Sequence, residues 1–344
     1  RVMTFMPPML MMLMNLLGIA IVWVASHRIN AGNMQVGSMT AFLTYSMMIV
    51  MSFMILTVMS ILIPRAGVAA NRIDEVIRSE SSVLDSSDAI YINECSGRLE
   101  FDNVSFRYEG SNEDALSGIS FTANPGETTA IIGSTGSGKS TIVNLIPRFF
   151  DVTAGCITLD GVDIREISMK SLRDQIGLVP QKGILFSGTI DSNIRFGNES
   201  ETPEEVREAA EIAQALEFIE EKEDKFESAI AQGGSNVSGG QKQRLSIARA
   251  IAKKPKILVF DDSFSALDMK TDAKLRRVLA KHEKEATKII VAQRVGTIID
   301  AEQIIVLDEG EIVGKGRHRD LLRTCETYRQ IAESQLSKSE LEVE

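Results

Sequence analysis

The chain of 344 residues is longer than one ordinary domain, and its charges are distributed very unevenly. Residues 1–64 contain no acidic residue and only two Lys or Arg, Arg1 and Arg28, so the remainder carries a formal charge of (37 − 2) − 47 = −12. This acidic balance argues against a general nucleic-acid-binding protein, and three widely spaced cysteines argue against a disulfide framework or a cysteine metal site.

Two uncharged stretches, residues 2–26 and 39–64, predict membrane-spanning helices. At about 1.5 Å per residue, a helix over either stretch exceeds the roughly 30 Å thickness of the hydrocarbon layer. A signal peptide is the alternative for the first stretch, but its apolar segment is typically only about 7 to 15 residues long. Pro7 and Pro8 predict a kink or a break in the first helix. Because the sequence opens on this apolar run with Arg1, we expect it to be the C-terminal portion of a longer protein.

The basic residues around these spans indicate their orientation. Arg1, Arg65, Arg72 and Arg78 lie outside the two spans, whereas only Arg28 lies in the loop between them, which predicts that both outer ends face the cytoplasm. Thirteen of the 15 methionines lie in residues 1–63. Methionine suits a surface that accepts varied apolar ligands and also suits lipid-facing positions, so the composition leaves both readings open.

The rest of the chain has the pattern of an α/β domain. Residues 66–77 predict a helix that leaves the membrane, and residues 78–97, rich in Ser and Asp, predict a linker. Short apolar runs at 128–132, 176–179, 257–260, 288–291 and 304–307 alternate with helix-like segments, which predicts a largely parallel core sheet. We therefore expect two transmembrane helices in residues 1–66, a linker in 67–97, an α/β domain in 98–335 and an acidic tail in 336–344.

A phosphate-binding loop is predicted between the first of these strands and a helix-like run at 141–150. The loop matches G-x-x-x-x-G-K-[ST] and consists of Gly133, Ser134, Thr135, Gly136, Ser137, Gly138, Lys139, Ser140 and Thr141. Its glycines let backbone N–H groups converge on an anion, Lys139 adds a charge for the outer phosphates of ATP, and Ser140 would ligate Mg²⁺. The alternative is a glycine-rich turn without a ligand.

Two carboxylates follow the apolar run at 257–260, where ligands lie in open α/β sheets. Asp261 would hold Mg²⁺ or its bound water. By itself this pattern is equally typical of a strand that ends in a polar turn.

Residues 237–241, Val-Ser-Gly-Gly-Gln, lead into an alanine-rich helical run and resemble the signature of the ATP-binding cassette (ABC) family, with Val237 in place of leucine. The resemblance covers residues 98–335, and the two preceding spans resemble the last two helices of an ABC exporter's membrane domain. It implies an ABC-type fold with a mixed sheet core and a helical subdomain. Another P-loop ATPase is the alternative.

The resemblance also implies roles for individual residues. Tyr108 would stack on adenine, and Gln181 would sense Mg²⁺ and the membrane domain. The signature would bind the nucleotide held by a second subunit, which implies a partner chain. Its residues are Ser238, Gly239, Gly240 and Gln241.

Two positions depart from the family pattern. Asp262 stands where family members with a competent site have Glu, and Gln293 stands where they have a His that contacts the γ-phosphate. Asp262 is one methylene shorter, and Gln293 carries neither a charge nor a transferable proton. We expect Lys139, Asp262 and Gln293 to form a slow catalytic group. Residues 231–236 also lack the Glu-Arg-Gly often found before the signature.

These patterns predict a subunit of an ABC exporter, an integral membrane protein of a bacterial-type cell membrane with a cytoplasmic ATPase domain. ATP and Mg²⁺ would be its cofactors, and a small amphipathic or apolar molecule its substrate. The partner would be a second half-transporter with the competent site. The alternatives are a homodimer with two slow sites and an ATP-gated channel or regulatory membrane protein.

Overall fold

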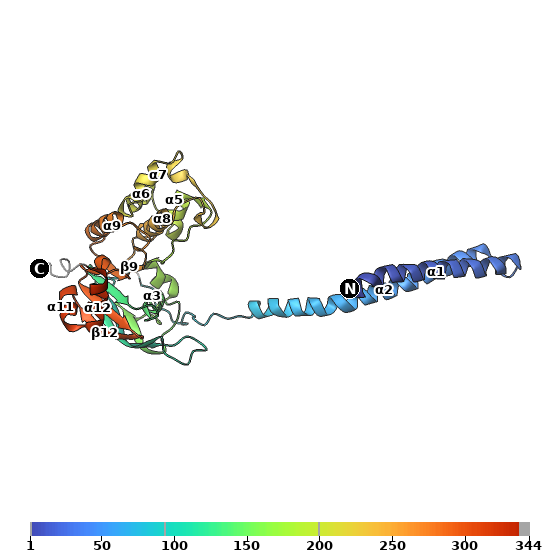
Figure 1. The fold of residues 1–344 in the computed structure, drawn as a ribbon, viewed down its shortest axis with the longest axis horizontal. Helices are drawn as coiled ribbons and strands as arrows, with labels where there is room; N and C mark the ends of the chain where they lie inside the picture. Colours follow the sequence, from blue (N-terminus) through green and yellow to red (C-terminus); the bar gives the residue numbers. More distant parts are fainter. Residues whose placement is uncertain (1, 93, 199, 337–344) are drawn as a thin grey trace. The chain divides into compact units, whose positions relative to one another are not determined.

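The computed structural model describes residues 2–92, 94–198 and 200–336, which form two compact units divided between Ser81 and Ser82 (Figure 1). The first unit consists of two helices, α1 (Val2–Asn30) and α2 (Val36–Ile77). The second unit holds all of the β-strands in the described part of the chain. The expected order, a helical segment followed by an α/β domain with a mixed sheet, is confirmed.

Both helices of the first unit are long and apolar enough to cross a membrane, over Pro8–Asn30 and Val36–Ile77. Their apolar side chains are mostly exposed, as lipid-facing residues would be. Their hydroxyl groups bond within the helix, as Thr44 and Ser52 do to the carbonyls of Thr40 and Met48 at 2.9 and 2.8 Å. These internal bonds leave few polar groups that would need water.

The helices differ from the expected spans at their prolines. α1 is helical through Pro8, where a kink or break was predicted, and α2 continues through Pro64 into the segment expected to be a separate helix. A proline removes one backbone hydrogen bond, and the intact turns on both sides hold these long helices together.

A six-stranded sheet forms the centre of the second unit, in the order β12-β11-β3-β10-β9-β6, with only β12 antiparallel to its neighbour. The predicted strand ranges agree with the observed ones to within one residue at each end. The strands are β3 (Thr128–Gly133), β6 (Ile176–Val179), β9 (Ile257–Asp261), β10 (Thr287–Val291), β11 (Gln303–Asp308) and β12 (Glu311–Gly316).

Apolar side chains cover both faces of this sheet. Ile131 packs into one apolar core, whereas its neighbours Ala130 and Ile132 pack into the other. A strand buried on both faces must be apolar at successive positions, which explains the continuous apolar runs in the sequence.

A second, antiparallel sheet packs on the Ile131 side, in the order β2-β1-β4-β5. Of its strands, the sequence predicts only the first, from the alternation of Leu99, Phe101, Val104 and Phe106. Its members are β1 (Leu99–Phe106), β2 (Leu116–Ala123), β4 (Ala154–Leu159) and β5 (Val162–Asp163). A two-stranded sheet joins β7 (Gly188–Thr189) and β8 (Ala229–Ile230).

Helices cover the sheets and build a separate lobe, in which Figure 1 shows α5, α6, α7 and α8 together. The lobe helices are α5 (Ile190–Ile194), α6 (Pro203–Ile212), α7 (Leu216–Glu220) and α8 (Gly239–Ala252). This lobe corresponds to the expected helical subdomain. The remaining helices are α3 (Lys139–Leu145), α4 (Met169–Asp174), α9 (Met269–His282), α10 (Val295–Ile298), α11 (His318–Thr324) and α12 (Glu326–Gln335).

The helix after the phosphate-binding loop is shorter than predicted. It was expected over 141–150, but α3 ends at Leu145. Pro147 has no N–H to continue the helical hydrogen bonds, and Arg148 adopts a left-handed conformation with φ of 54°. The chain therefore turns away from the helix axis at this point.

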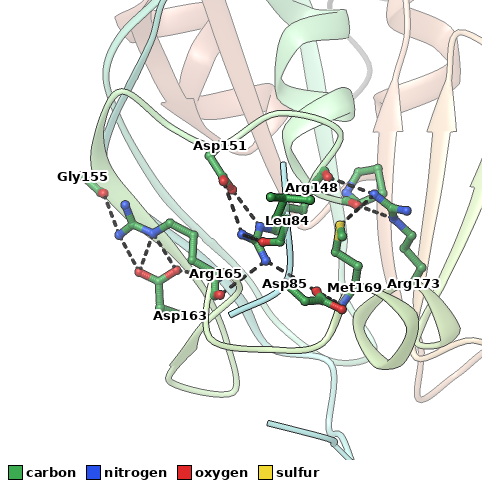
Figure 2. A network of polar contacts seen from close by, with 10 residues as sticks. Leu84, Asp85, Arg148, Asp151, Gly155, Asp163, Arg165, Met169 and Arg173 are labelled. Carbon is green, nitrogen blue, oxygen red and sulfur yellow. Dashed lines mark hydrogen bonds and ion pairs between the residues drawn. The ribbon is translucent and has the colours of Figure 1, made fainter. Parts of the chain in front are cut away.

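Part of the expected linker is docked on the second unit by Arg148, whose contacts Figure 2 shows. The buried guanidinium donates to the Leu84 carbonyl at 3.0 Å and to the Asp151 carboxylate at 2.7 Å. Asp85 in turn accepts a hydrogen bond from the Met169 N–H at 2.8 Å, at the start of α4. The chain is thus held against the second unit a few residues after α2 ends.

Candidate functional site

The phosphate-binding loop joins the end of β3 to the start of α3. Steric constraints explain why two of its positions are occupied by glycine. Gly136 and Gly138 have φ values of 87° and 96°, which residues with a side chain rarely adopt. A Cβ atom at Gly138 would also lie 2.6 Å from Leu116 Cδ2. The loop conformation therefore depends on glycine at these positions.

Lys139 lies inside this loop. Its Nζ donates to the carbonyls of Gly133 and Ser134 at 2.9 and 2.5 Å and to Ser137 Oγ at 3.3 Å. Burial lowers the pKa of the ammonium group, and the nearby carboxylates of Asp262 and Asp261 oppose that shift. The loop thus holds a partly desolvated cation at the N-terminus of α3, which is suited to an anionic ligand.

Asp261, the last residue of β9, faces the loop. Burial raises the pKa of its carboxyl group, as does the adjacent Asp262, whereas Lys139 and a hydrogen bond from Ser140 lower it. The Ser140 hydroxyl and the Asp261 carboxylate are oxygen ligands of the kind that Mg²⁺ prefers. In residues 2–92, 94–198 and 200–336, no group of three or more His, Cys, Asp or Glu could hold a metal. The pair of Ser140 and Asp261 fits Mg²⁺, which is usually held by one or two carboxylates together with phosphates and water.

Asp262 connects the ends of three neighbouring strands. Its Oδ2 accepts a hydrogen bond from Gln181 Nε2 at 3.2 Å and another from Gln293 Nε2 at 2.7 Å. Gln181 follows β6, Asp262 follows β9 and Gln293 follows β10, and these strands are adjacent in the sheet. The structure therefore brings together three of the residues singled out in the sequence, and two amide groups occupy one oxygen of the carboxylate.

Tyr108 lies at the other side of the loop. Its hydroxyl is 3.1 Å from Thr141 Oγ1, and its ring packs edge-on against Phe106 and Phe150. The residue as a whole remains 38% exposed, so it is accessible to a ligand.

The loop, Tyr108, Gln181 and Gln293 line one cleft of about 920 Å³. That size is within the range of small-molecule sites. The opposite wall includes residues of α12 that the sequence gave no reason to select, Thr327, Gln330, Ile331, Ser334 and Gln335. Asp308 also lines the cleft and accepts a hydrogen bond from Ser134 Oγ at 3.3 Å.

The signature residues lie at the start of α8, and within the described chain none of them lines this cleft. Ser238 caps the helix: its Oγ accepts a hydrogen bond from the Gln241 N–H at 3.2 Å, and Gln241 Oε1 accepts one from the Ser238 N–H at 3.0 Å. Ser238 and Gly239 are exposed, and a Cβ atom at Gly239 would meet no atom within 4 Å. The structure therefore separates the predicted site residues into two groups, one around the cleft and one at the start of α8.

Comparisons with known proteins point to one family. Residues 116–265 match the family model for ABC transporters. The chain is 44% identical over 332 residues to an uncharacterized ABC transporter ATP-binding protein of Mycobacterium tuberculosis (strain ATCC 25618 / H37Rv), with 95% of the chain and 57% of that protein covered. It is 36% identical over 334 residues to the ATP-dependent lipid A-core flippase of Hahella chejuensis, with 97% and 57% covered.

A solved structure of a bacterial Atm1-family ABC exporter with ATP bound is also similar, with a TM-score of 0.80 and 32% identity. The match covers 98% of this chain and 59% of that exporter chain. The chain therefore spans a little over half the length of these relatives.

Proposed function

We propose that this chain, which carries the ATP-binding domain of an ABC transporter and has ABC exporters as homologues, forms one subunit of an ATP-driven exporter. The two apolar helices would lie in the membrane, with the second unit in the cytoplasm. An amphipathic or apolar substrate would suit the methionine-rich helices, and one similar protein is named an ATP-dependent lipid A-core flippase.

The cleft would bind ATP with Mg²⁺. The loop amides and Lys139 would hold the phosphates, and Tyr108 would stack on the adenine. Ser140, Asp261 and Gln181 would hold the ion or its bound water. When bound, Mg²⁺ neutralises phosphate charge. The Ser140 contact with Asp261 supports this assignment, because it places oxygen ligands from the loop and the strand beside each other.

The signature would act on a nucleotide held by a second subunit. Ser238 accepts a bond from Gln241 and keeps its hydroxyl hydrogen free to donate, while the exposed N–H of Gly239 lies at the N-terminus of α8. Donors at a helix N-terminus suit an anion that arrives from outside this chain.

We further propose that the partner is a different subunit and that this chain provides the slow site. The observation that carries this proposal is the paired contact of Gln181 and Gln293 with Asp262 Oδ2. A carboxylate held by two amides, and one methylene shorter than Glu, is poorly placed to accept a proton from an attacking water. The absence of an effective general base slows hydrolysis by about 10²- to 10⁴-fold.

Subunit content and transport measurements test this function. The complex would be purified from its native membrane, its subunits identified, and ATP-dependent uptake of a fluorescent amphipathic dye measured in inverted vesicles. Two different half-transporter chains and accumulation against a gradient are expected. A complex of this chain alone would support the homodimer, and ATP-dependent flux that stops at equal concentrations would support the channel.

A further inference from the structure

The last residue of α12 contacts the backbone on both sides of Arg294. Gln335 Oε1 accepts a hydrogen bond from the Val295 N–H, and Gln335 Nε2 donates one to the Gln293 carbonyl, both at 2.8 Å. The contact joins residues about forty positions apart. A single side-chain amide thereby fixes the short segment that carries Gln293.

The local sequence cannot satisfy this backbone by itself. Val295 is the first residue of α10, and the first N–H groups of a helix have no partner within it. The residue before it, Arg294, makes no side-chain capping bond to these groups. Gln335 therefore supplies, from another helix, an acceptor for the Val295 N–H, one of the unpaired groups at the start of α10.

α12 is itself firmly placed. Tyr328 and Ala332 are completely buried on its inner face, and the Tyr328 hydroxyl is 2.7 Å from His318 Nδ1. Gln335 thus extends from an anchored helix that also forms one wall of the cleft. Because the side-chain amide of Gln335 bonds to residues 293 and 295, the position of α12 determines where this segment lies.

We propose that Gln335 is a positioning residue of the nucleotide site. By fixing the backbone at 293–295, it places Gln293 Nε2 at 2.7 Å from Asp262 Oδ2. Gln335 acts through Gln293 and does not itself contact the reacting atoms. The inference about the reaction rests on the proposed function, whereas the contact itself can be tested without it.

The first experiment measures amide hydrogen exchange in the assembled complex in nanodiscs, for Gln335→Ala and for Glu333→Ala as a matched control. Glu333 is an exposed side chain of similar size on the same helix, and its ion pair is with Arg329. Peptides covering 293–298 should exchange about 5- to 10-fold faster in Gln335→Ala than in the control, because the Val295 N–H loses its acceptor. Equal exchange in the two variants would overturn the proposal, whatever the ATPase activity.

The second experiment separates positioning from folding. With the partner's site inactivated, Gln335→Ala should raise kcat for ATP about 3- to 10-fold and leave KM unchanged, because it loosens Gln293 and so weakens one of the two amide hydrogen bonds that hold Asp262 Oδ2. Gln335→Glu keeps an acceptor for Val295 but lacks a donor for the Gln293 carbonyl, so its kcat should be intermediate.

The same substitution in a Gln293→Ala chain should cause no further rise of kcat, because the side chain that Gln335 positions is gone. An equal change of kcat in both backgrounds, or a parallel rise in KM, would overturn the positioning role. A parent complex without any ATPase activity would refute the proposed function instead, and the exchange result would still decide whether Gln335 holds the segment.

Discussion

Combining Asp262→Glu with Gln293→His should raise the rate of ATP hydrolysis at this chain's site. In the structure, the Asp262 carboxylate is held back by amide hydrogen bonds from Gln181 and Gln293. The longer Glu side chain would carry the carboxylate about 1.5 Å further toward an attacking water. A His at 293 would remove one of the amide donors and supply a group that can carry a proton.

The size of the effect follows from what is restored. General-base catalysis contributes about 10²- to 10⁴-fold, and a misplacement of about 1 Å can cost on the order of 10²-fold. Because the phosphate-binding loop and Lys139 stay unchanged, we expect kcat to rise about 10- to 100-fold. Asp262→Glu alone should give less, since Gln293 could still bond to the new carboxylate.

The assay is ATP hydrolysis in nanodiscs, with the partner's site inactivated so that only this chain's site turns over. Adding Lys139→Ala to the double variant is the control, and it should return the rate to background. An unchanged rate in the double variant, with the dimer and ATP binding intact, would refute the reasoning that the two substituted positions limit this site.

Three further outcomes are expected. Lys139→Ala should weaken ATP labelling of this chain at least about 10-fold, because it removes the cation that the loop surrounds; labelling at the parent level would contradict the loop assignment. Ser238→Arg should abolish most ATPase activity of the complex, by about 10²- to 10³-fold, whereas Asp262→Ala should reduce it only modestly; equal losses would indicate a symmetric pair. Arg148→Met should lower the free energy of unfolding by about 2–4 kcal/mol, measured by thermal melting, and make residues 82–92 more sensitive to protease. Arg165→Met, which removes a more exposed ion pair, should have a smaller effect.

The sequence was most informative where local patterns determine position. Strands β6 and β9 are buried on both faces, so their apolar runs mark their ends closely. Because Gln181 and Asp262 follow neighbouring parallel strands, they lie at the same edge of the sheet. That both Gln181 and Gln293 meet the same oxygen of Asp262 depends on side-chain geometry, which the sequence does not contain.

The elements that were missed depend on contacts between distant segments. In β2, the adjacent exposed residues Ser117 and Gly118 interrupt the alternation that is typical of a strand, so the start of β2 resembles a loop until it pairs with β1. Arg148 lies after a helix and before an acidic residue, with no motif to indicate that it binds the Leu84 carbonyl. Gln335 is an ordinary polar residue at the end of a helix, and only the tertiary path of α12 brings it to Gln293.

The glycines support the view that the two groups of site residues serve different nucleotides. Gly138 is required by this chain itself, because a Cβ atom there would collide with Leu116. The structure does not require glycine at position 239, because a Cβ atom there would meet no atom within 4 Å and the φ of Gly239 is not positive. Glycine forms helices less readily than alanine, because it loses more backbone freedom on folding. Within the described residues no contact requires a glycine at 239, which is understandable if the backbone there must approach a ligand held by a second subunit.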